Sequence, residues 1–262
     1  MPSRNSAFKS CQNQTIRMSE IRTILLTHQN SERVERMLRY WDRITLRQTV
    51  FVAFGGSDED FAALAHPHRA LIQSPRLRTQ DHQREKQSYT PVFQAAWKWL
   101  ESQDCRYVHF IEYDHIPLVD DFHQRMISFV EREKCDLAGF HVAQVDASSN
   151  AHYLNHLADP SFLGFWDRVS IRSDKRVVLT MFGSGSFWRK EAFAAVANLS
   201  EDIPMYLEIF QPTAAHHLGF RVRGFREQDR FVRNLGDLGS RLDSLRNQGA
   251  WSAHPVKTLW NL

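Results

Sequence analysis

The sequence predicts an α/β fold with a mainly parallel, Rossmann-like central sheet and helices on both of its faces. In the first half of the chain, short runs of β-branched and aromatic residues alternate with longer segments whose apolar residues recur at helical spacing. Parallel strands need a crossover between them, so this alternation favours a parallel sheet. The 262 residues suffice for one large or two small α/β domains.

The first half supplies most of the expected sheet. Its expected elements are strands at 21–27, 49–54 and 70–73, a strand that begins at Tyr107, and helices that start at Asn30 or Ser31, at Thr90 and near Asp121.

The second half is less regular. Strands at 137–142 and 176–182 are expected at the sheet edge, on either side of an aromatic-rich insertion. Two helices, at 186–198 and 204–218, and a strand at 220–225 follow, and residues 226–262 are expected to be irregular.

Two carboxylates follow the apolar run that begins at Tyr107. Glu112 and Asp114 are separated by one residue, and Pro117 ends the run. Ligands of open α/β sheets bind at the carboxyl ends of strands. Two carboxylates placed there suit a divalent cation that in turn holds phosphates. An acid that caps a helix or faces solvent is the simpler alternative for an isolated pair of this kind.

The composition and charge of the chain limit its expected binding partners and its expected cellular compartment. The formal net charge of +3 gives no support for nucleic-acid binding, and no segment approaches the length of a transmembrane helix. Cys11, Cys105 and Cys135 lack metal-like spacing, so free thiols in a reducing cytoplasm are expected. Residues 1–20 are polar and are interpreted as an N-terminal extension. Peripheral contact with the inner face of a membrane stays open, and the sequence does not indicate the oligomeric state.

Several motifs, in order along residues 21–257, resemble those of GT-A-fold nucleotide-sugar glycosyltransferases. Residues 24–30 are similar to the opening strand of that family, and residues 52–58 to its second strand. Glu112-Tyr113-Asp114 resembles its acid-x-acid motif, and residues 181–189 resemble its glycine-rich turn near the acceptor. The family would place acids at Phe54 and Leu207, where this chain has apolar residues.

The resemblance implies a metal-dependent, inverting transfer of a sugar from a nucleotide diphosphate sugar to a glycan or lipid-linked hydroxyl acceptor. It implies a single domain over residues 21–262, with a donor half at 21–117 and an acceptor half at 118–262. Mn²⁺ or Mg²⁺ would be held by Asp114 and His254, with His115 as a competing ligand, and Glu208 would be the general base. The implied donor-binding residues are Thr27, Gln29, Asn30, Asp58, Lys86, Glu112 and Lys257. The implied acceptor-binding residues are Gly183, Gly185 and Trp188. Further candidates, for stacking on an acceptor sugar, are Tyr153, Phe162, Phe165 and Trp166.

Three alternatives remain at this point. A metal-dependent phosphohydrolase would need further Asp and His residues at strand ends, which the sequence does not supply. A nucleotidyltransferase would need a glycine-rich basic loop after the first strand, whereas residues 27–30 contain no glycine. A non-catalytic sugar- or nucleotide-binding protein with the same fold is compatible with the apolar residues Phe54 and Leu207.

Overall fold

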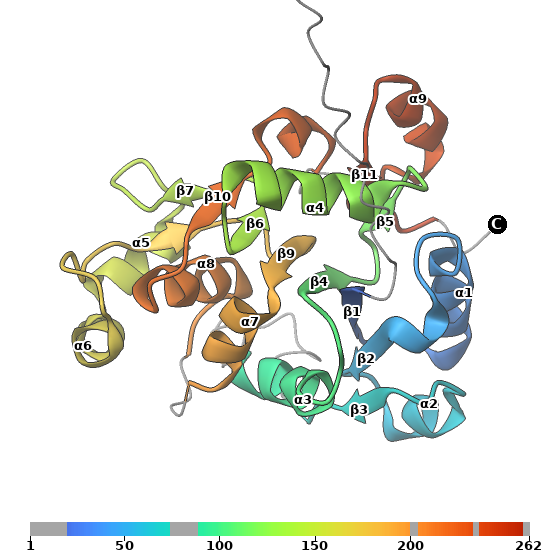
Figure 1. Cartoon of the computed structure of the whole chain (residues 1–262), viewed down its shortest axis with the longest axis horizontal. Helices are drawn as coiled ribbons and strands as arrows, with labels where there is room; N and C mark the ends of the chain where they lie inside the picture. The colour runs from blue at the N-terminus through green and yellow to red at the C-terminus, as the bar shows by residue number, and fades with distance from the viewer. Residues whose placement is uncertain (1–19, 74–88, 200–203, 233–235, 259–262) are drawn as a thin grey trace, which may run out of the picture.

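The computed structural model contains a seven-stranded central sheet with helices on both faces (Figure 1). The structure describes residues 20–73, 89–199, 204–232 and 236–258. The strand order is β10-β6-β9-β4-β1-β2-β3, and every neighbouring pair is parallel except the two that include β9. The predicted α/β class and mainly parallel sheet are therefore confirmed.

The strands and helices have the following bounds. The central strands are β1 (Ile21–Thr27), β2 (Val50–Phe54), β3 (Arg69–Leu71), β4 (Tyr107–Glu112), β6 (Leu137–Gly139), β9 (Ser186–Arg189) and β10 (Val222–Gly224). The helices are α1 (Ser31–Trp41), α2 (Asp58–Ala63), α3 (Thr90–Leu100), α4 (Phe122–Glu133), α5 (Ala151–Ala158), α6 (Pro160–Val169), α7 (Lys190–Ala197), α8 (Leu207–His217) and α9 (Leu242–Asn247). Two small ribbons pair β5 (Ile116–Pro117) with β11 (Ser252–Ala253), and β7 (Ala143–Gln144) with β8 (Leu179–Thr180).

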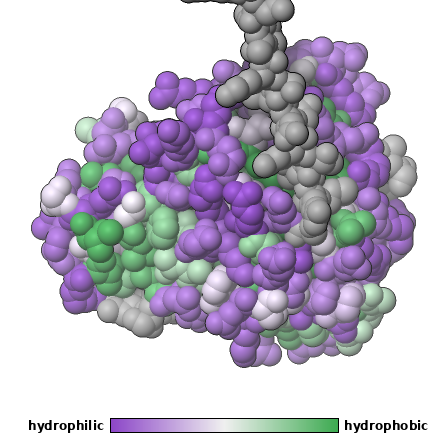
Figure 2. Space-filling view, viewed as in Figure 1, coloured by the Kyte–Doolittle hydropathy of each residue, from purple (hydrophilic) through white to green (hydrophobic). Residues whose placement is uncertain are grey.

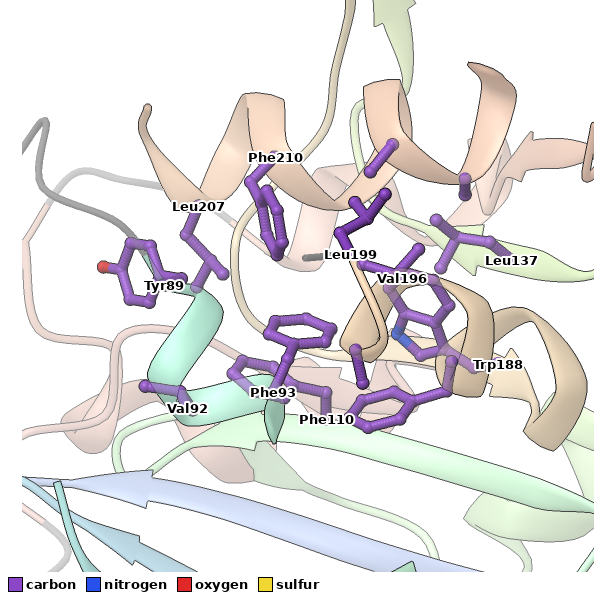
Figure 3. Packing of buried hydrophobic residues seen from close by; sticks show 14 of the residues in the cluster. Tyr89, Val92, Phe93, Phe110, Leu137, Trp188, Val196, Leu199, Leu207 and Phe210 are labelled. Atoms are coloured by element: carbon purple, nitrogen blue, oxygen red, sulfur yellow. The ribbon is translucent and has the colours of Figure 1, made fainter. Parts of the chain in front are cut away.

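Each face of the sheet has its own hydrophobic core, because successive side chains of a strand point to opposite faces. Tyr107 and Ile111 of β4 join the cluster that includes the buried faces of α1 and α4. Val108 and Phe110 join the cluster under α3, α7 and α8. Figure 3 shows that second cluster, in which Phe93 of α3 lies 5.3 Å from Phe110, measured between ring centroids.

The outer surface is mostly polar. Hydrophilic residues cover much of the face seen in Figure 2, and hydrophobic residues gather on its left, in the region of α5, α6 and α8. Within the described residues, no helix combines the length and the apolar character needed to span a membrane.

The structure corrects several predictions for the second half. Residues 186–189 form β9, a central antiparallel strand, and not the start of a helix. The aromatic-rich insertion forms α5 and α6, and the predicted strand at 176–182 is reduced to the two residues of β8. The C-terminal part contains α9 and β11, although no element was expected there. Short segments gave weak periodicity, and tertiary pairing decided their structure.

Two histidines are fully buried in the core beneath α1 and α4. His109 of β4 and His123 of α4 have their Nδ1 and Nε2 atoms 3.3 Å apart, and Trp41 packs against both rings. Burial lowers the pKa of His123 to about 3, and it lowers the pKa of His109 well below its usual value, helped by the neighbouring His123. Both imidazoles are therefore neutral in the folded protein near pH 7.

This pair predicts acid-sensitive stability. The unfolded chain binds protons on these histidines below about pH 6.5 and the folded chain does not, so stability is present above that pH and is lost as pH falls toward 3. His123→Gln keeps a donor for His109 and removes one titrating group. We expect it to reduce the pH dependence of the free energy of unfolding by up to about 1.4 kcal/mol per pH unit, measured by urea unfolding between pH 7.5 and 5. His68→Gln, outside this core, is the control, and an equal reduction in both variants would contradict the assignment.

Candidate metal and donor site

Three potential metal ligands converge at the carboxyl end of β4. Glu112, Asp114 and His254 each offer one ligand atom, and these atoms all lie within 4.8 Å of one another. The His254 Nε2 atom lies 3.0 Å from Asp114 Oδ1 and 3.9 Å from Glu112 Oε2. This is the only group of three or more such residues found in the described part of the chain.

The geometry and the chemistry of this group fit a divalent cation. Neighbouring ligands of an octahedral ion at 2.0–2.1 Å lie about 3 Å apart, which is close to the spacing seen here. Two carboxylates with an imidazole form a donor set suited to Mn²⁺ and acceptable to Mg²⁺. Asp114 and His254 are buried, at 7% and 6% exposure, and the buried Nδ1 of His254 has no hydrogen-bond partner among the described residues.

The C-terminal segment brings His254 to this position. β11 pairs with β5, and the Val256 amide donates to the Asp114 carbonyl at 2.8 Å. His254 also forms a parallel bridge with Val232. Backbone hydrogen bonds therefore hold the segment on both sides of His254.

The group Glu112, Asp114 and His254 is here called the metal cluster, and a loop at residues 182–185, here called the glycine loop, contacts two of its members. The Phe182 ring lies 4.7 Å from the His254 ring, measured between centroids. Ser184 Oγ accepts a hydrogen bond from the Glu112 amide at 2.8 Å and lies 3.2 Å from Nδ1 of His115. The loop therefore connects the position of Glu112 to that of His254.

His115 is a buried linker and not a member of the cluster. Its Nδ1 faces Ser184 Oγ, and its Nε2 lies 3.0 Å from Ser252 Oγ. Burial, with a smaller effect from His254, lowers the pKa of His115 well below its usual value. Since both ring nitrogens already have hydroxyl partners, the geometry favours His254 over His115 as the candidate ligand.

Glu208 lies next to the same loop. It is in the first turn of α8, and its Oε1 would be 3.4 Å from a Cβ placed on Gly183. The buried Gln211, one turn further along, donates to the Gly183 carbonyl at 2.6 Å and accepts a hydrogen bond from Ser186 at 2.5 Å. Burial raises the pKa of Tyr153, and the negative charge of Glu208 adds to the shift.

Several predicted donor-binding residues lie at the ends of β1 and β2. Some of them stabilise the local backbone, and others are exposed. Thr27 is buried, and its Oγ1 accepts a hydrogen bond from the Gln29 amide at 3.2 Å. Asn30 is the N-cap of α1, because its Oδ1 accepts from the Arg33 amide at 3.0 Å. Asp58 begins α2 and is exposed beyond the end of β2.

Two neighbours of this strand end were missed in the sequence. His28 and Tyr113 meet edge to face at 5.1 Å between ring centroids. Burial raises the pKa of Tyr113 to about 12, with help from the charges of Asp114 and Glu112, and burial lowers the pKa of His28. The sequence offered one signal for each: His28 directly follows β1, and Tyr113 lies between the two acids Glu112 and Asp114.

The remaining predicted residues differ in outcome. Lys257 is exposed and follows Val256, whose amide binds the Asp114 carbonyl, so it lies near the cluster. Lys86 lies outside the described residues. Trp188 is wrong as an acceptor contact, because it is fully buried in the core and its Nε1 donates to Ser186 Oγ. The stacking candidates Phe162, Phe165 and Trp166 are core residues as well.

Comparison with known proteins adds little. No family model and no curated protein sequence matches the chain. Similar solved structures include a mannosyltransferase from Pyrobaculum calidifontis in complex with GDP-Man and Mn²⁺, at 11% identity and a TM-score of 0.41 over 78% of this chain. This chain covers 54% of that protein, about half its length. A cytidylyltransferase from Leptospira borgpetersenii serovar Hardjo-bovis matches at 7% identity and a TM-score of 0.42, over 79% of this chain and 75% of that one. Likenesses this low do not assign an activity.

Gly185 provides a test of the loop geometry. Its φ is +81°, and a Cβ there would lie 2.3 Å from the His115 ring. Gly185→Ala is therefore expected to lower the free energy of unfolding by about 2 kcal/mol or more, measured by urea unfolding. Gly183→Ala is the matched control, because its Cβ would meet nothing closer than 3.3 Å and its φ is not positive. Equal losses in the two variants would contradict this account.

Proposed function

We propose that this chain is a metal-dependent glycosyltransferase that moves a sugar from a nucleotide diphosphate sugar to a hydroxyl acceptor. The convergence of Glu112, Asp114 and His254 at the carboxyl end of β4 is the observation that carries the proposal. That position is where open α/β sheets bind ligands. The acid-x-acid motif that resembles GT-A glycosyltransferases supplies two of the three ligand atoms.

On the donor side, the chain's own residues would hold the diphosphate through the cation. Asp114 and His254 would bind the ion, and Glu112 would contribute to its shell or contact the ribose. When bound, such an ion neutralises negative charge on the leaving diphosphate. Lys257, exposed beside the cluster, would add positive charge there. His28 and Tyr113 meet at the end of β1, and Asp58 follows the end of the neighbouring β2; the nucleoside would lie at these strand ends.

On the acceptor side, Glu208 is the proposed general base. Its carboxylate stands beside Gly183, and the glycine loop joins it to the metal cluster. A base facing the sugar from the acceptor side would remove the hydroxyl proton while the hydroxyl oxygen bonds to the anomeric carbon and the bond from that carbon to the leaving diphosphate breaks. Such a direct displacement inverts the anomeric centre. The acceptor is proposed to be a glycan or a lipid-linked sugar, and contact with a membrane surface would follow from the latter.

A non-catalytic binding protein is the second candidate, and two positions favour it. Phe54 and Leu207 stand where the glycosyltransferase motifs commonly carry acids, and both side chains are buried, at 0% and 1% exposure. Phe54 packs beneath Gly56, where a Cβ would lie 2.5 Å from its ring. These side chains are part of the core and give neither base nor donor contacts.

Metal binding separates the cluster from an ordinary group of surface acids. Asp114→Asn and His254→Gln are expected to weaken Mn²⁺ binding by at least about tenfold, because each removes or neutralises one of three ligands. Isothermal titration with Mn²⁺ measures the effect. Asp120→Asn, an exposed neighbour in sequence, is the control and should bind as the wild type does. Wild-type protein without a Mn²⁺ site at millimolar metal would refute the metal assignment.

Turnover separates the enzyme from the binding protein. With a panel of nucleotide diphosphate sugars and Mn²⁺, we expect the wild type to release a nucleoside diphosphate, and Glu208→Gln to lower that rate by about 10²–10⁴-fold. Binding of the donor should be unchanged in Glu208→Gln, and Glu191→Gln on α7 serves as the control. Tight donor binding with no turnover by the wild type would instead favour the non-catalytic protein.

A further inference from the structure

A second groove lies on the β10 side of the sheet, away from the metal cluster. Its volume is about 770 Å³, and its walls come from the ends of α4 and α8, from β7 and β10, and from the segment before β8. In Figure 1, β7, β10 and α8 lie to the left of β5 and β11, and His254 of the metal cluster directly follows β11. The charged and titratable residues that line the groove are Lys134, Asp136, Arg172, His216, Arg221 and Arg223.

The groove has an excess of positive charge. Four of its side chains are permanent cations, and Asp136 is its only carboxylate. That carboxylate is already engaged, because Oδ2 accepts from the Arg221 amide at 2.8 Å and Oδ1 lies 3.7 Å from the Arg189 guanidinium. Within the described residues, none of the four cations forms an ion pair. Uncompensated cations gathered in a concave surface attract anions.

One of the cations is held in place before any ligand arrives. The half-buried Arg172 donates from Nε to the His216 carbonyl at 2.9 Å and from Nη2 to the Phe220 carbonyl at 3.1 Å. These two bonds fix the plane of the guanidinium and leave some of its five N–H donors for another acceptor. An arginine fixed in this way recognises phosphate oxygens without a further loss of side-chain entropy.

We propose that this groove is a second binding site, which takes the phosphate group of a small anionic ligand. It is separate from the metal cluster: β10 is three strands away from β4 in the sheet, about 14 Å at the usual strand spacing. His216 also lies eight residues along α8 from Glu208, about 12 Å of helix rise. The inference does not depend on the proposed transferase activity.

Basic residues on an edge strand have a competing explanation. Charged side chains at a sheet edge prevent pairing with another molecule, and β10 is such an edge. That explanation accounts for Arg221 and Arg223, which flank or belong to the strand. It does not account for Arg172 or Lys134, which come from outside β10 and face the same groove.

The test uses the full chain in EDTA, so that metal-dependent binding at the metal cluster does not contribute to the measured signal. Inorganic pyrophosphate is titrated calorimetrically at low salt into the wild type, into Lys134→Gln/Arg223→Gln, and into the control Arg39→Gln/Arg241→Gln, which removes two exposed charges elsewhere. We expect wild type and control to bind alike and the groove variant to bind at least about tenfold more weakly. Unchanged melting temperatures would confirm that all three proteins are folded.

A second experiment, with lipid vesicles, distinguishes a lipid headgroup from a soluble ligand as the source of the phosphate. Co-sedimentation with phosphatidylglycerol vesicles that depends on the groove residues would identify a lipid headgroup, whereas groove-dependent binding of pyrophosphate alone would identify a soluble ligand. No binding of pyrophosphate by the wild type at millimolar concentration, or equal binding by the groove variant, would overturn the proposal. If the wild type binds neither pyrophosphate nor vesicles and the groove variant aggregates, the basic residues protect the sheet edge and the proposal is overturned.

Discussion

A single buried histidine organises the candidate site. His115 joins Ser184 of the glycine loop to Ser252 of β11, and in this way ties three segments that are far apart in sequence. Since burial keeps this imidazole neutral, the network adds no charge beside the two carboxylates. Ser184 in turn accepts a hydrogen bond from the Glu112 amide, so the same network fixes the end of β4. Together with the β5–β11 pairing and the Val256 amide bond to Asp114, it holds Glu112 and His254 in one frame.

The first half of the fold could be predicted well from the sequence. β1 spans the expected residues, and α1 begins at Ser31 behind the expected Asn30 cap. These segments are long, strongly periodic and carry their own end signals. β9 could not be predicted, because Ser186–Arg189 is a strand of only four residues, and its antiparallel pairing depends on contacts with the distant strands β4 and β6. Trp188 was placed wrongly for the same reason.

The site was predictable where its residues are adjacent in sequence, and less so where it depends on tertiary hydrogen bonds. Glu112 and Asp114 carry a local motif, and His254 was found through the resemblance. Ser252 and Gln211 had no such signal: each matters only because the fold places it opposite a distant polar group. Phe54 and Leu207, which looked like lost functional acids, are explained by their burial. The sequence thus indicated the candidate ligands but not the hydrogen-bond network that holds them.

The central claim is that Asp114 and His254, with Glu112 beside them, hold one divalent cation. Anomalous diffraction from a crystal soaked in Mn²⁺ tests it most directly, because the method locates the metal without reference to activity. The account predicts one strong peak within bonding distance of Asp114 Oδ1 and His254 Nε2, at the carboxyl end of β4. A saturated crystal with no peak there, or with its only peaks at other acidic residues, would contradict the account.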